Sequence, residues 1–146
     1  EPILVLKGDG SSTPAILNTG DILKSLVQDF ASSPGGPSWN ASTGEITVPT
    51  DGIWRISGTL HADDYQGSSD SNIAELAIYV NGVRKLRFAP HYCGWGQPDG
   101  CSFAFDGVVQ CAAGDVITLR AWQDKFRHYR EADYSQVVVQ RIRGPV

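Results

Sequence analysis

Methionine and cysteine are scarce in this sequence. Its 146 residues contain no methionine and three cysteines, so at least one thiol cannot form an internal disulfide. A disulfide-framework domain is therefore excluded. Cys93 and Cys101 flank the segment GWGQPDG and could close it as a disulfide, although the odd count favours three free thiols. No Cys-x-x-Cys pair is present, so we expect no metal site and no cofactor.

Long apolar runs and an excess of basic residues are also missing. The 12 lysines and arginines are outnumbered by 16 aspartates and glutamates, which gives a formal net charge of -4. No stretch approaches the roughly 20 apolar residues that a membrane-spanning helix needs. Because nucleic acids and anionic lipids attract basic surfaces, neither nucleic acid nor membrane is expected as a main partner.

The sequence also lacks recognisable catalytic motifs. His61, His91 and His128 lie on or beside different predicted loops, and no Ser or Cys stands in a frame such as G-x-S-x-G. Asp63 and Asp64 could act with Asp70 as glycosidase carboxylates, but a hydrated acidic loop explains them better. We therefore expect a protein that is not an enzyme.

The sequence does contain many turns and short alternating runs. Its 16 glycines and 8 prolines separate short segments in which polar and apolar residues alternate. This pattern is typical of an all-β fold. In the stretch GIWRISGTL, Trp54 falls on the apolar face and Arg55 on the polar one, with Gly52 in the preceding turn. Asn81-Gly82 predicts a two-residue type I′ hairpin turn. Residues 21–30 suit either a helix or a strand, and the β-rich surroundings favour a strand.

The order of several motifs resembles one known family. STGEITVP followed by DGIWRISGTLH, then ELAIYVNGVRK, SFAFDGVVQCAAGDVITLRAWQD and YSQVVVQRI, are similar to successive segments of C1q-like domains. The resemblance covers roughly residues 15–142. It implies an all-β, ten-stranded antiparallel jelly-roll sandwich of the C1q and tumour-necrosis-factor type, assembled as a homotrimer. On this basis residues 1–14 are interpreted as an N-terminal arm and residues 15–146 as the jelly-roll domain.

The closing strand supplies the predicted trimer contacts. Val137 and Val139 fall on one face of this strand, and Tyr134, Gln136 and Val138 fall on the other. The first face suits the sandwich core. The resemblance implies that the second face is buried against other subunits.

The function that this resemblance favours is a non-catalytic surface protein of a bacteriophage virion. Stalkless domains of this type decorate or cement capsids, or form fibre tips. Because no shaft precedes the domain in this sequence, capsid decoration is favoured, with the major capsid protein as partner. The apolar arm Pro2, Ile3, Leu4, Val5 and Leu6 is the predicted capsid anchor.

The alternative is a secreted or fibre-borne C1q-domain lectin that recognises cell-surface glycans, which would make the protein extracellular. Its predicted site lies on the loops at residues 61–72 and 90–100. The predicted ligand-binding residues are Asp63, Asp64, Tyr65, Tyr92 and Trp95. Asn40-Ala41-Ser42 is a glycosylation sequon, which carries a glycan only in a secreted animal protein and so separates the two functions.

Overall fold

The structure is a computed structural model of the chain. It describes residues 2–9, 21–24, 26–32, 34–64, 72–89, 91–93, 101–123, 126–128 and 135–145. Side chains are described for these residues except at 21, 61–64, 72–74, 91–93, 101–103, 122–123 and 126–128. None of the described residues forms a helix that is long and apolar enough to cross a membrane.

The described residues form β-strands joined by turns and extended segments. In chain order the strands are β1 (Ile3–Gly8), β2 (Asp21–Ile22), β3 (Leu26–Ala31), β4 (Ser38–Asn40), β5 (Glu45–Thr47), β6 (Gly52–Asp64), β7 (Asn72–Val80), β8 (Val83–Arg87), β9 (His91–Cys93), β10 (Cys101–Cys111), β11 (Val116–Gln123), β12 (Phe126–His128) and β13 (Gln136–Arg143).

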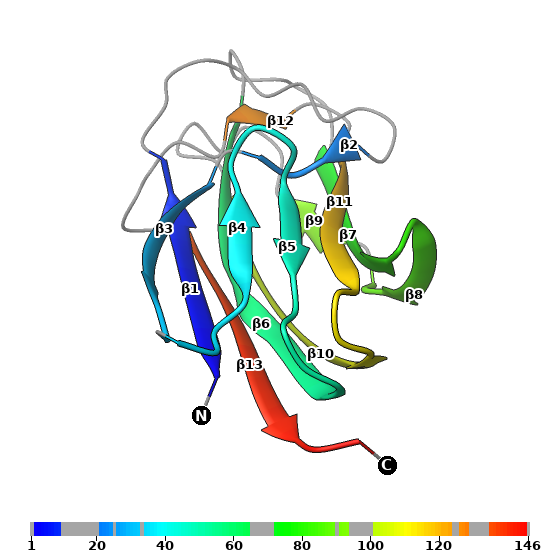
Figure 1. The fold of residues 1–146 in the computed structure, drawn as a ribbon. Coiled ribbons are helices and arrows are strands. Elements are labelled where there is room, and N and C mark those ends of the chain that lie inside the picture. The colour runs from blue at the N-terminus through cyan, green and yellow to red at the C-terminus, as the bar shows by residue number, and fades with distance from the viewer. Residues whose placement is uncertain are drawn as a thin grey trace.

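These strands build two antiparallel sheets that pack face to face (Figure 1). The six-stranded sheet has the order β10-β6-β13-β1-β3, with β12 paired to β6. The seven-stranded sheet has the order β4-β5-β11-β7-β8, with β2 paired to β11 and β9 paired to β7. Each main path contains five strands, so the two paths together give the ten strands expected of the jelly roll. The all-β prediction is confirmed.

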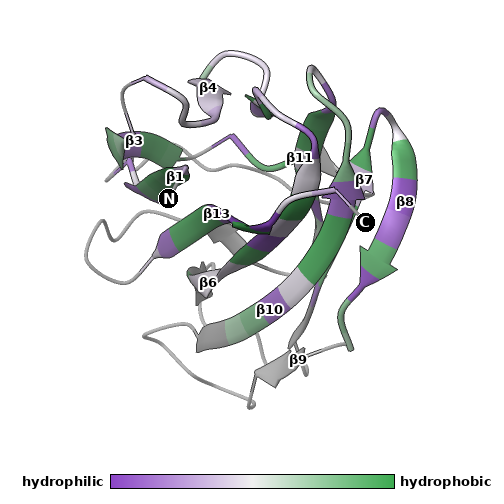
Figure 2. Cartoon of the chain, turned by 60° about the horizontal axis from the view of Figure 1, so that its bottom comes forward, coloured by the Kyte–Doolittle hydropathy of each residue, from purple (hydrophilic) through white to green (hydrophobic). Residues whose placement is uncertain are grey.

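The core lies between the sheets and follows the alternation of the sequence. Trp54 on β6 is fully buried, whereas the adjacent Arg55 is exposed, as predicted. Val137 and Val139 on β13 are also fully buried, and they belong to the same core cluster as Ile78 on β7 and Ile117 on β11 of the other sheet. In Figure 2, hydrophobic and hydrophilic segments follow one another along β10 and β13. Each strand therefore contributes one face to the core.

The interpretation of residues 3–8 as part of an N-terminal arm is wrong. These residues form β1, which lies inside the six-stranded sheet and pairs with both β13 and β3. Leu4 and Leu6 are fully buried and Val5 is 3% exposed, so they cannot also insert into a capsid. For a short apolar run, an internal strand is more favourable than an arm exposed to solvent. In the sheet its backbone groups form hydrogen bonds and its side chains are buried.

Residues 21–30 do form β-structure, but as two strands and not one. β2 pairs with β11 of the seven-stranded sheet, and β3 pairs with β1 of the six-stranded sheet. Between them, the Leu23 amide donates to the Leu119 carbonyl over 2.7 Å. Leu23 and Leu26 are both buried, a spacing of three that one regular strand cannot place on one face. The chain crosses between sheets at this point.

Two predicted turns have the expected backbone. Asn81 and Gly82 have φ values of 49° and 78°, the positive pair that a type I′ hairpin requires. Gly52 has a φ of 154° and is the first residue of β6. A Cβ there would lie 2.5 Å from the Arg143 carbonyl oxygen, so the close approach of β13 also requires glycine.

Candidate functional site

The outer face of the six-stranded sheet carries unpartnered apolar side chains. The cross-strand register places Phe30 beside Val5, Val5 beside Val138, and Val108 beside Arg55 on this face. Phe30 is 53% exposed and Val108 is 54% exposed, and Val138 is half-buried. We call this surface the six-strand face; it is defined by the exposed Val27, Phe30 and Val108, by the half-buried Val138, and by Val5, which its neighbours already bury.

The charges on this surface are already paired within the chain. Arg55 makes a bidentate interaction with Asp106, at 2.8 Å from Nε to Oδ1 and 2.7 Å from the terminal nitrogen to Oδ2. The hydrogen bond from Arg55 holds the pKa of Asp106 below its usual value. Lys7 Nζ lies 3.8 Å from Asp29 Oδ1. Paired charges can be covered by another apolar surface at less cost than isolated ones.

Of the predicted trimer contacts, two lie on this face. Val138 belongs to it, and Gln136 is exposed beside Thr59 and Lys7 in the register. Tyr134 lies outside the described residues. Subunit contacts themselves stay a prediction, since one chain is present.

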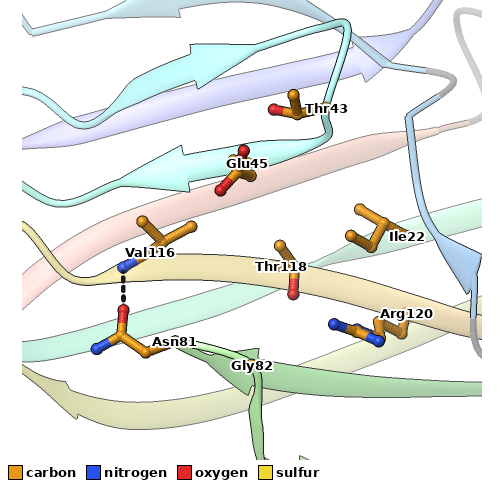
Figure 3. A pocket seen from close by; sticks show the side chains of 8 residues that line it. All are labelled: Ile22, Thr43, Glu45, Asn81, Gly82, Val116, Thr118 and Arg120. Atoms are coloured by element: carbon orange, nitrogen blue, oxygen red, sulfur yellow. Dashed lines mark hydrogen bonds between the residues drawn. The ribbon is translucent and has the colours of Figure 1, made fainter.

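A second surface is a groove along β11 on the outer face of the seven-stranded sheet (Figure 3). Its volume is about 460 Å³. Val116, Thr118 and Arg120 alternate along its floor, as the two-residue period of a strand requires. The other residues come from neighbouring elements: Ile22 from β2, Thr43 and Glu45 from the β4–β5 hairpin, and Asn81 and Gly82 from the β7–β8 turn.

The groove exists because β11 changes partners along one edge. Val116 and Ile117 pair with β5, whereas Arg120 and Ala121 pair with β2. Thr118 stands between these two pairings. Gly44 brings the β4–β5 turn close over this gap, since a Cβ there would lie 2.5 Å from a side-chain carbon of Ile22.

Three buried polar atoms in this groove have no hydrogen-bond partner. They are Thr43 Oγ1, Thr118 Oγ1 and Arg120 Nε. Thr118 as a whole is only 5% exposed. The Arg120 guanidinium lies over the Tyr79 ring at 4.3 Å from the centroid, and within the described residues it has no acidic partner. A buried polar group that makes no hydrogen bond costs about 1–3 kcal/mol. Three such groups around one groove are therefore unusual.

The other end of the groove is fixed by a hydrogen-bonded turn. Asn81 Nδ2 donates to Asp115 Oδ1 over 2.8 Å, and the Val116 amide donates to Asn81 Oδ1 over 2.9 Å. The Ala112 amide donates to Asp115 Oδ2 over 2.8 Å. These bonds, chiefly the one from Asn81, hold the pKa of Asp115 below its usual value.

The predicted ligand-binding residues are found at the ends of strands or outside the described residues. Asp63 and Asp64 belong to β6 and pair through the backbone with His128 and Phe126 of β12. Tyr92 belongs to β9 and pairs with Ile73. The strands therefore extend into the segments 61–72 and 90–100 that were predicted to be loops. Tyr65 and Trp95 lie outside the described residues, and the side chains of Asp63, Asp64 and Tyr92 are not described, so the five-residue ligand site stays a prediction.

The groove residues were not predicted from the sequence. Alternation in VITLRAW does place Thr118 and Arg120 on the face opposite Ile117 and Leu119, but this pattern reads as an ordinary solvated face. Ile22 of β2 and Thr43 of the β4–β5 turn line the groove around the buried Thr118. Only the tertiary structure contains that information.

Comparison with known proteins supports the fold. No protein-family model matches the chain, and no curated protein matches it by sequence. Among solved structures it is similar to Eiger TNF from S. frugiperda, with a TM-score of 0.67 and 13% sequence identity over 100% of this chain and 96% of that chain. At this identity the likeness concerns architecture alone. The chain has the TNF-like jelly-roll fold.

Proposed function

We propose that this protein is a non-catalytic, trimeric surface protein whose subunits associate through the six-strand face. The observation that carries the proposal is the exposed apolar side chains of that face, with Phe30 on the β3 edge and Val108 on the β10 edge each more than half exposed. Burying each of these half-exposed side chains would contribute on the order of 1 kcal/mol. Because Arg55 pairs with Asp106, covering the face would not bury either charge alone, which lowers its desolvation cost.

Light scattering tests the assembly. The native protein should have three times the monomer mass at micromolar concentration. Phe30→Arg and Val108→Glu should give folded monomers, because each places an unpaired charge in the interface. Val83→Arg is the matched control, since Val83 is 56% exposed but lies on β8 of the other sheet. A native monomer, or a trimer that survives both interface substitutions, would refute the proposal.

The role that we propose for this trimer is decoration or cementing of a bacteriophage capsid, or the tip of a fibre. A trimer presents three equivalent surfaces, so weak contacts to the major capsid protein would be strengthened through effective concentration. The contact would not use Leu4 or Leu6, which are core residues. Purified virions should contain the protein at a fixed copy number. Its absence from intact particles would rule out the virion role.

A secreted, glycan-binding module is the second candidate. One observation favours it: Asn40 of the sequon is exposed at the end of β4. Its Oδ1 accepts hydrogen bonds from the Ser42 amide and hydroxyl, at 3.0 and 2.7 Å. A glycan on Asn40 of the natural protein would establish secretion. Glycan-array binding that is lost on Trp95→Ala with the fold retained would then support the lectin.

A further inference from the structure

The groove along β11 combines a cation, an anion and unpaired hydroxyls within one small volume. Arg120 lies at one end beside Ile22, Thr118 lies in the middle of the floor, and Glu45 lies beside Val116 (Figure 3). The volume of about 460 Å³ falls within the range of small-molecule sites. From these features we infer that the groove binds a small carboxylic acid that carries a neighbouring hydrogen-bond donor, an α-amino or α-hydroxy acid.

The carboxylate is assigned to the Arg120 end. Stacking on Tyr79 holds the guanidinium in place, while its buried Nε–H has no acceptor. A ligand carboxylate would accept from this Nε–H and from the hydroxyl of Thr118, which is also buried and unpaired. Bonds from a charged donor to a carboxylate are the strong class of hydrogen bond, so this end supplies most of the affinity.

The donor of the ligand is assigned to the Glu45 end. A carboxylate accepts hydrogen bonds but donates none, so Glu45 selects an ammonium or hydroxyl group over a second anion. The unpaired Thr43 hydroxyl lies on the same hairpin and can bond either group. Ile22 and Val116 supply apolar contact for the carbon skeleton. An inorganic anion would satisfy Arg120 but would be repelled by Glu45.

The groove and the six-strand face lie on opposite layers of the sandwich. The six-strand face that we propose for subunit contacts therefore does not include the groove. Binding in the groove is consequently independent of the proposed assembly, and the two can fail separately.

Nuclear magnetic resonance titration of the 15N-labelled full chain tests the inference with four probes. L-serine and L-lactate should shift the amides of Thr118, Arg120 and Glu45, and acetate should bind more weakly because it has no donor for Glu45. Ethanolamine, which has no carboxylate, should not bind. Whether serine or lactate binds more tightly identifies the class of acid.

Matched variants make the test specific. Arg120→Gln and Thr118→Val should each weaken binding about tenfold or more, because each removes a bond to the carboxylate. Arg143→Gln removes the same charge at an exposed position, the last residue of β13 on the other sheet, and should leave binding unchanged. If no probe shifts these amides at about 10 mM, or if Arg120→Gln binds as well as Arg143→Gln, ordered water alone fills the groove and the inference is overturned.

Discussion

Trp54 is the largest fully buried side chain of the core, and its indole Nε1 donates to the Thr50 carbonyl over 3.3 Å. Trp54→Ala should lower the free energy of unfolding by about 3–5 kcal/mol, because it empties a large volume between the two sheets. Thermal or urea unfolding at one fixed protein concentration measures this change. Arg55→Ala is the comparison on the exposed face of the same strand, and it should change the melting temperature much less than Trp54→Ala does. An unchanged melting temperature for Trp54→Ala would contradict the observed strand register.

Cys111 is a free, buried thiol at the end of β10. Burial raises its pKa to about 11, so little thiolate exists near neutral pH. Since the thiolate is the reactive form, alkylation of Cys111 at pH 8 should be at least about tenfold slower in the native protein than in the unfolded one. Peptide mass spectrometry after a timed iodoacetamide pulse separates Cys111 from the other two cysteines. Equal labelling in both states would show that this thiol is accessible.

At the scale of the elements, β1 is the strand whose position most changes the interpretation. It lies between β13 and β3, and its Leu4 and Leu6 are fully buried. Deleting residues 1–8 should therefore prevent folding, whereas a free arm could be removed without harm. Leu6→Ala is the milder variant, and it should cost about 2–5 kcal/mol in a urea unfolding experiment. A soluble, cooperatively folding deletion variant would contradict the central position of β1.

The Asn81–Asp115 turn joins the β7–β8 hairpin to the start of β11 and predicts a pH dependence. The pKa of Asp115 is lowered in the folded chain, so its contribution to stability is present above the pKa of the unfolded chain. That contribution is lost as the pH falls through the lowered folded pKa. Asp115→Asn should therefore lower the melting temperature at pH 7, and the difference from the native protein should shrink on acidification. A difference that stays constant down to about pH 2 would contradict this assignment.

Strand patterns with one buried face could be predicted from the sequence because alternation is local information. β6 follows its predicted faces, with Trp54 buried and Arg55 exposed. The crossing between β2 and β3 could not be predicted in this way, since the hydrogen bond of Leu23 is to Leu119, far along the chain. The short apolar run of β1 likewise has no local feature that distinguishes an internal strand from an exposed arm.

At the scale of the whole molecule, the order of motifs predicted the jelly roll but not its functional surfaces. The six-strand face depends on the cross-strand register that places Phe30, Val5 and Val138 in one row. The groove depends on three separate segments that meet around Thr118. Both surfaces therefore belong to tertiary structure. A family resemblance that supplies topology does not supply the side chains that a given member places on it.

The adjacency of β1 and β13 also determines how the domain responds to force. Ile3 pairs with Gln140, and the Arg141 amide donates to the Pro2 carbonyl over 3.0 Å. The two ends of the chain thus leave from the same end of one antiparallel ladder (Figure 1). Tension applied between them loads the hydrogen bonds of this ladder one after another, beginning at Pro2, and never all at once. Stretching would therefore separate β1 from β13 one residue pair at a time, before the seven-stranded sheet carries any load.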